Sequence, residues 1–296
     1  MRAAERGFLL LTSHLGDPDC KVLTAAQFRS LTNRARQMER LSEQRELMEE
    51  DLISLGYDRA SARNILYLLS REEQLDYYLN QAKRADCTPI SRNSDRYPGL
   101  LHCRLGADSP GCLWAKGDRS LLEKEAVALV GSRELLEENR EFAFRVGKEA
   151  AEQGYVLVSG NARGADRTAQ ESCLEHGGQV ISVVADSLEK HKEQPGVLFL
   201  SEDGFDMAFS AQRAHSRNRV IHALGKMTFV AQCTYGSGGT WKGTAQNLRQ
   251  GWSPVFCYND GTPAMAELSQ MGAVLIDTWE LSDFSTLKAN NITFMN

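Results

Sequence analysis

The sequence lacks a long hydrophobic run. Its apolar stretches, such as residues 8–11 and 126–130, are far shorter than the ~20 residues that a membrane-spanning helix needs. The stretch near the N-terminus is also too short for the apolar core of a signal peptide. Its seven cysteines include no closely spaced C-x-x-C pair, which is typical of reduced thiols. These absences predict a cytoplasmic protein without a membrane span.

The sequence also lacks an excess of positively charged residues. The chain carries 34 Lys and Arg against 39 Asp and Glu, a net charge of −5. No overall basic field attracts nucleic acid, so any surface that binds anions must be local. The length of 296 residues allows about two domains at ~150 residues each.

Several signatures of known sites are missing. After the first buried strand stands GSRELL instead of G-x-G-x-x-G, which disfavours a nicotinamide dinucleotide. The glycine-rich turn that ends at Thr240 continues as Trp241-Lys242-Gly243, without the Gly-Lys-Ser/Thr of an ATPase loop. No G-x-S-x-G elbow is present, and the histidines and cysteines are scattered. We therefore expect no catalytic residue, no cofactor and no metal.

The first part of the chain is predicted to be helical. Residues 34–53 are rich in Arg, Glu, Leu and Met and hold no Gly or Pro, and residues 51–69 resemble two short helices around a Gly-Tyr turn. Such a helical pair is usually structural or contacts another protein. Residues 91–121 contain Pro98, Pro110 and Gly111 and predict an extended connector. The predicted domains are thus 1–90, a connector over 91–121, and 122–296.

The last domain alternates strands and helices. Phe142, Val146 and Ala150 lie four residues apart on one helix face that ends at Gly154, and a second helix is expected over 165–176. This alternation predicts an α/β fold with a doubly wound, mostly parallel, Rossmann-like sheet. The expected strands are 126–130, 155–158, 180–184, 197–200, 227–232, 255–258 and 273–276.

Three Gly- and Ser-rich turns follow the first, second and fifth of these strands. Ligands of such sheets bind at the carboxyl ends of the strands, where free N–H groups and helix N-termini favour a phosphate. One such turn is ordinarily just a tight turn, but three that converge with two arginines favour a phosphate-bearing ligand. The candidate residues are Gly131, Ser132, Arg133, Ser159, Gly160, Asn161, Arg163, Gly164, Asp166, Ser237, Gly238, Gly239 and Thr240.

A fourth element carries local positive charge. Residues 211–226 contain four basic side chains and no acidic one, a charge of +4 in a protein of −5. Most charge runs are solvated helix faces, yet the absence of acids here favours a surface for a polyanion. Its candidate residues are Arg213, Arg217, Asn218 and Arg219. Asp166 is expected to cap a helix or orient an arginine rather than act as a base.

These motifs occur in the order of a known family. The sequences SDRYPGLL (94–101), SPGCLWAKGD (109–118), VGSR (130–133), SGNARGAD (159–166), SRNR (216–219) and SGGT (237–240) resemble the DNA-processing protein A (DprA/Smf) family over about 94–260. The resemblance implies an extended Rossmann fold that binds single-stranded DNA in a positively charged pocket. It also implies homodimers that load a RecA-type recombinase during natural transformation, with Arg133 and the 160–164 loop on phosphates.

The last glycine-rich turn leaves alternatives open. The usual Gly-Ser-Leu-Ile-Thr-Ala of the family is Gly-Ser-Gly-Gly-Thr-Trp here. This version resembles wider nucleotide-binding relatives, which suggests an antitoxin-like or regulatory partner of a toxin-like protein in phage defence that senses nucleotide or DNA through the same pocket. It also resembles the loop of nucleotide phosphoribohydrolases, but Gly243 stands where that loop has its catalytic Glu.

Overall fold

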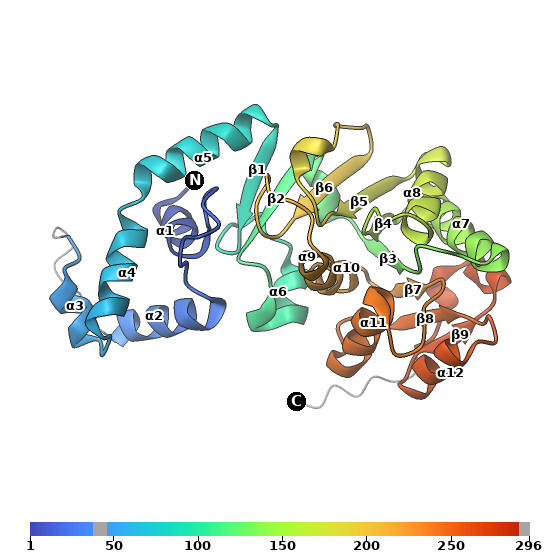
Figure 1. The fold of residues 1–296 in the computed structure, drawn as a ribbon. Helices are drawn as coiled ribbons and strands as arrows, with labels where there is room; N and C mark the ends of the chain where they lie inside the picture. The colour runs from blue at the N-terminus through green and yellow to red at the C-terminus, as the bar shows by residue number, and fades with distance from the viewer. Residues whose placement is uncertain (38–45, 290–296) are drawn as a thin grey trace. The chain divides into compact units, whose positions relative to one another are not determined.

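The computed structural model describes residues 1–37 and 46–289 (Figure 1). Part of the predicted helical segment, residues 38–45, lies outside the described residues. The chain forms two compact units, each assembled from separate stretches of sequence. The predicted division at residues 90 and 121 stays a prediction. Unit 1 comprises Met1–Tyr97, Pro110–Trp114 and Glu202–Gly204, and unit 2 comprises Pro98–Ser109, Ala115–Ser201 and Phe205–Asn296.

Unit 1 is largely helical. The two helices predicted around the Gly-Tyr turn are present, and Gly56 supplies the positive φ of +84° at that turn. Asp58 caps the second of them by accepting a 2.8 Å hydrogen bond from the Ser61 N–H, and Ile65 packs in the core with Leu52. The elements are α1 (Ala3–Thr12), α2 (Ala25–Gln37), α3 (Glu49–Ser54), α4 (Arg59–Leu69), α5 (Glu72–Arg84) and β1 (Cys87–Ser91).

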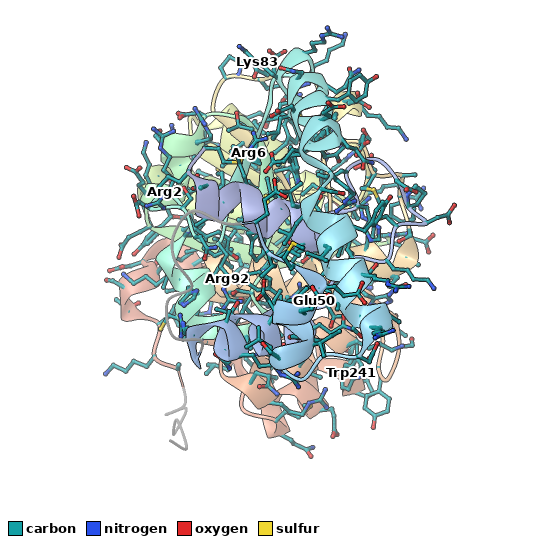
Figure 2. All side chains as sticks on the ribbon, turned by 90° about the vertical axis from the view of Figure 1, so that its left-hand side faces the viewer. Arg2, Arg6, Glu50, Lys83, Arg92 and Trp241 are labelled. Atoms are coloured by element: carbon teal, nitrogen blue, oxygen red, sulfur yellow. The ribbon has the colours of Figure 1, made fainter. Side chains whose placement is uncertain are left out.

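A surface ion pair network joins α1 to α5. Arg6 lies between the two helices (Figure 2), where it donates to Glu72 and, at 2.7 Å, to Asp76 Oδ1. The hydrogen bond from Arg6 lowers the pKa of Asp76. Because these carboxylates are solvent-exposed, we expect the network to add little stability.

The stretch 91–121 corrects the expectation of an extended connector. Its turn-forming residues bracket regular elements instead of preventing them: Pro98 immediately precedes a helix, a position that proline tolerates. Gly111 lies so close to the Phe8 ring that a Cβ there would overlap it. The elements are α6 (Gly99–Leu105), η1 (Gly106–Asp108), β2 (Cys112–Gly117) and η2 (Arg119–Glu123).

Unit 2 contains the predicted parallel sheet. The order of its seven strands is β6-β5-β4-β3-β7-β8-β9, and each neighbouring pair is parallel. The α/β prediction is confirmed, and the strands begin and end within two residues of the expected positions. They are β3 (Ala126–Val130), β4 (Val156–Ser159), β5 (Gln179–Val183), β6 (Val197–Ser201), β7 (Thr228–Val230), β8 (Val255–Tyr258) and β9 (Val274–Ile276).

The strand order reverses between β3 and β7. From β3 the chain runs outward through β4, β5 and β6, and it then returns to the other side of β3 to begin β7. The loops that leave β3 and β7 therefore diverge at their carboxyl ends and open a crevice. This is the topological switch point, where doubly wound sheets bind their ligands.

Helices pack on this sheet and on one another (Figure 1). Phe142, Val146 and Ala150 are fully buried, as their spacing predicts. Gly147 brings α7 against α8, because a Cβ there would overlap the carbonyl of Ala169. The remaining helices are α7 (Glu137–Glu152), α8 (Ala165–Glu175), η3 (Leu188–Lys190), α9 (Ala211–Ser216), α10 (Asn218–Leu224), α11 (Gly238–Gln250), α12 (Pro263–Gln270), η4 (Thr278–Ser282) and η5 (Phe284–Thr286).

Two further findings concern the described residues as a whole. Within 1–37 and 46–289, no helix has the length and hydropathy to cross a membrane. All seven cysteines are free thiols, and six of them are buried.

Candidate functional site

A cavity of about 340 Å³ lies at the switch point, and we call it the switch-point cavity. Its lining comes from the loop after β3, the start of α8, the α9–α10 junction and the turn between β7 and α11. Ten of the predicted residues meet here although they are more than 100 positions apart at the extremes. They are Gly131, Ser132, Arg133, Asp166, Arg217, Asn218, Ser237, Gly238, Gly239 and Thr240.

Backbone acceptors hold the wall of this cavity together. The Thr240 hydroxyl donates to the Gly131 carbonyl at 2.9 Å, which ties the turn after β7 to the loop after β3. The Asn218 amide donates to the Gly239 carbonyl at 3.1 Å and so ties that turn to α10. The polar side chains that the sequence placed in a ligand site therefore also fix the loops that form it.

Asp166 and Arg217 form the buried floor. Asp166 Oδ2 accepts hydrogen bonds from the Gly160 and Ala162 N–H groups, both at 3.2 Å, and lies 4.0 Å from the Arg217 guanidinium. Arg217 also donates to the Gly160 carbonyl at 3.0 Å. Burial raises the pKa of Asp166, whereas Arg217 and the two N–H groups act in the opposite direction. Asp166 thus orders the loop after β4 and faces an arginine, as expected.

A second cavity, of about 450 Å³, continues from the first. The two share Arg133 and Arg217 in their lining. Three further predicted residues from the loop after β4 line the second cavity: Gly160, Asn161 and Arg163.

A third cavity, of about 530 Å³, shares residues with the second and contains side chains that the sequence analysis missed. Arg167, Lys190 and Lys192 line it, together with His191, whose Nε2 lies 2.9 Å from Asp186 Oδ1. In the sequence DSLEKHKE (186–193), acidic residues flank Lys190 and Lys192, so the segment does not stand out as a run of positive charge. Only the fold brings Arg167 alongside them.

Two arginines on the cavity mouth differ in their pairing. Arg163 forms an exposed ion pair with Glu134 at 3.4 Å. Arg133 is exposed, and within the described residues its guanidinium makes neither a hydrogen bond nor an ion pair. Because it lines both the first and the second cavity, this guanidinium is available to an anionic ligand.

Two predicted basic residues are directed elsewhere. Arg213 donates to the carbonyls of Ala185, Met207 and Ala208 and to the Ser201 hydroxyl, at 2.7–3.0 Å. Arg219 donates to the carbonyls of Asp108, at 3.0 Å, and Ser216, at 2.6 Å. Neither lines the switch-point cavity, because backbone oxygens of other segments attract both guanidinium groups. Both order the chain around the site.

Two loop residues also lie outside the first two cavities. Ser159 is fully buried, and its hydroxyl accepts a 2.6 Å hydrogen bond from Gln170. Gly164, at φ +87°, approaches the carbonyls of Ser132 and Arg133. His215, which was not among the predicted site residues of the segment 211–226, also lines the switch-point cavity.

Comparison with known proteins identifies the family. The model of the family described as DNA recombination-mediator protein A matches residues 88–278. The chain belongs to this family. The match takes in the loops after β3, β4 and β7 that form the switch-point cavity.

Two relatives of this family member show the extent of similarity in sequence. DNA processing protein DprA of Bacillus subtilis is 28% identical over 227 residues, which cover 70% of this chain and 72% of the relative. Protein Smf of Escherichia coli is 28% identical over 204 residues, which cover 63% of this chain and 53% of the relative.

Solved structures show the same fold. DNA processing protein A of Streptococcus pneumoniae superposes with a TM-score of 0.73 at 22% identity, over 98% of this chain and all of that one. The protein of the same name from Helicobacter pylori, described for its single-stranded DNA binding mode, gives 0.55 at 23% identity over 66% of this chain and 94% of that one.

Gly164→Ala in this family member is expected to lower the free energy of unfolding by about 1–3 kcal/mol, the usual cost of a strained backbone. A Cβ at this position would lie within about 2.5 Å of two carbonyl oxygens. Gly177→Ala is the matched control, since Gly177 has φ +76° but no atom within 4 Å of its Cβ position. Urea denaturation of both variants should show the larger loss for Gly164→Ala. Equal losses would mean that the loop moves aside at no cost.

Proposed function

We propose that this protein binds single-stranded DNA through the switch-point cavity and its two continuations, without catalysing a reaction, and acts in DNA recombination. The membership of the recombination-mediator family and the described binding mode of the Helicobacter pylori relative support this. The observation that carries the proposal is the exposed guanidinium of Arg133, which makes neither a hydrogen bond nor an ion pair within the described residues and belongs to a residue that lines two connected cavities.

The chemistry of the cavity suits a phosphodiester. Gly238 and Gly239 begin α11 at the cavity wall, and the N-cap residue Ser237 makes no side-chain capping hydrogen bond. The first N–H groups of this helix therefore retain donors for an anion, and its positive end attracts one. The guanidinium of Arg133 can hold two phosphate oxygens at once.

The alternative of a phosphoribohydrolase receives no support from the same region. Gly243 is buried on α11, and a Cβ there would lie 3.2 Å from Asn218 Cβ and 3.4 Å from His222 Nε2. A glutamate at this position would therefore require the Asn218 or His222 side chain to shift. As part of the proposal, a homodimer delivers the bound strand to a RecA-type recombinase, in keeping with the recombination-mediator family.

Arg133→Ala is expected to weaken binding of a short single-stranded oligonucleotide roughly tenfold to a hundredfold, the scale of a lost hydrogen bond to a charged group. The slope of log affinity against log salt should also become shallower, because one phosphate contact fewer releases fewer counterions. Fluorescence anisotropy at several salt concentrations measures both effects.

Stability serves as the control for this variant. Arg133 is exposed, so the melting temperature should stay near that of the wild type, since surface substitutions usually change stability by less than ~0.5 kcal/mol. Wild-type affinity and an unchanged salt slope in Arg133→Ala would place the phosphate contacts elsewhere. No binding by the wild type at ~50 mM salt, where phosphate contacts are strong, would refute the proposed function.

A further inference from the structure

Two aromatic side chains flank the turn between β7 and α11. Tyr235 is 58% exposed, and its ring meets that of Trp241 edge to face, with centroids 5.0 Å apart and planes at 63°. Trp241 is partly exposed and lies at the surface (Figure 2). By contrast, Trp114 and Trp252 are 1% and 6% exposed. The pair is therefore not part of the core.

The two aromatic residues each follow a residue that lines the switch-point cavity, one at each end of the turn. Thr234 and Thr240 line the cavity, and Tyr235 and Trp241 are the residues that follow them. The hydrogen bond from Thr240 to the Gly131 carbonyl fixes the end of this turn to the loop that carries Arg133. The aromatic pair and the arginine thus keep a defined separation.

In an edge-to-face pair the edge of one ring contacts a face of the other, and the exposure of Tyr235 and the partial exposure of Trp241 leave ring surface accessible to a further aromatic ring. Aromatic rings prefer offset-stacked or edge-to-face neighbours, each worth more than the area it buries. Proteins that bind single strands combine phosphate contacts with aromatic side chains on which unpaired bases stack. Beside a cavity suited to phosphate, the ligand that offers such a ring is a nucleobase of the same strand.

We propose that Tyr235 and Trp241 form a stacking platform for an unpaired base of the strand whose phosphate lies in the switch-point cavity. The platform rests on the proposed function, because the cavity supplies the phosphate contact. Trp241 provides the larger ring, and Tyr235 holds it in place from the side. Stacking uses the face of the base, so the platform accepts any of the four bases.

Trp241→Ala tests the platform when two ligands are compared, a short oligothymidylate and an abasic oligonucleotide of the same length. Anisotropy should show a loss of affinity for oligothymidylate of about fivefold to a hundredfold, the range for one stacked base. Affinity for the abasic strand should not change. Trp241→Phe should restore most of the loss, because a ring face is present again.

Intrinsic fluorescence gives a second readout. In a Trp279→Phe variant, which removes the 73% exposed Trp279, oligothymidylate should quench the remaining emission and the abasic strand should not. Trp279→Ala is the matched control for loss of a surface tryptophan and should bind like the wild type.

The outcomes separate the two proposals. Equal losses for both ligands in Trp241→Ala would overturn the platform and assign Trp241 to positioning the turn. Normal binding by Trp241→Ala together with weakened binding by Arg133→Ala would overturn the platform alone. Failure of the wild type to bind either strand would overturn the proposed function and the platform with it.

Discussion

Arg217→Met is expected to lower the free energy of unfolding by about 3–5 kcal/mol, the usual cost of removing one partner from a buried ion pair. Arg217 and Asp166 are 7% and 6% exposed. The variant loses the hydrogen bond to the Gly160 carbonyl and leaves the Asp166 carboxylate buried without its cation. Urea denaturation monitored by circular dichroism measures the loss.

The double variant Arg217→Met, Asp166→Asn isolates the uncompensated charge. Asparagine retains an acceptor for the N–H groups of Gly160 and Ala162 but carries no charge, so the double variant should recover part of the stability. Arg219→Met is the control, since Arg219 is only partly buried. A double variant as unstable as the single one would show that the loss comes from packing and hydrogen bonds and not from charge.

As the pH falls from about 6.5 to about 3, the lowered pKa of His222 is expected to reduce the free energy of unfolding by about 1.4 kcal/mol for each pH unit. Burial, with a smaller contribution from Arg217, lowers its pKa to about 3. The unfolded chain therefore binds a proton below pH 6.5 that the folded chain does not, and stability falls as the pH falls.

His222 also belongs to a buried network of hydrogen bonds. The Asn247 amide lies 3.2 Å from Nδ1 as a donor, which makes that nitrogen an acceptor. A proton on Nδ1 would face this NH₂ group, whereas the Thr228 hydroxyl, also 3.2 Å from Nδ1, can accept a hydrogen bond from it. Asn247 is held in turn by the Ser253 N–H, which donates to its Oδ1 at 2.9 Å. Protonation of Nδ1 thus removes the hydrogen bond that it accepts from Asn247.

The comparison of pH slopes between the wild type and His222→Gln checks this prediction. The difference in slope belongs to His222 alone, because the other titrating groups are common to both proteins. Asp166 acts in the opposite direction: its raised pKa means that its protonation in acid favours the folded state. Identical slopes from pH 7 to 5 would show that His222 is protonated in the folded protein.

The positions of the strands follow from the sequence because a parallel strand covered on both faces is apolar throughout. The predicted strands 126–130 and 255–258 coincide with β3 and β8. Parallel strands have their carboxyl ends at one edge of the sheet, so the Gly- and Ser-rich turns after β3, β4 and β7 were correctly expected to converge. The stretch 91–121 was read wrongly because Pro98 and Gly111 mark the ends of elements as well as loops.

The groups that the arginine side chains contact cannot be predicted from the sequence. Arg213, Arg217 and Arg219 stand in one run of positive charge, yet only Arg217 lines the switch-point cavity. The other two are directed to backbone carbonyls, which every residue carries and no sequence pattern marks. His215 and Lys190 were not predicted as site residues. They line the cavities because of the path of the chain in the fold, which no local sequence pattern indicates.

The contact between Gly160 and Arg217 has an evolutionary consequence. A Cβ at position 160 would occupy the space of the Arg217 guanidinium, so a larger residue at 160 requires this guanidinium to move or a shorter side chain at 217. We therefore expect substitutions at the two positions, which are 57 apart in the sequence, to be coupled among homologues. Homologues without the arginine can carry a larger side chain at position 160 in the loop after β4. Such a side chain would change the shape of the crevice and therefore the ligands that it binds.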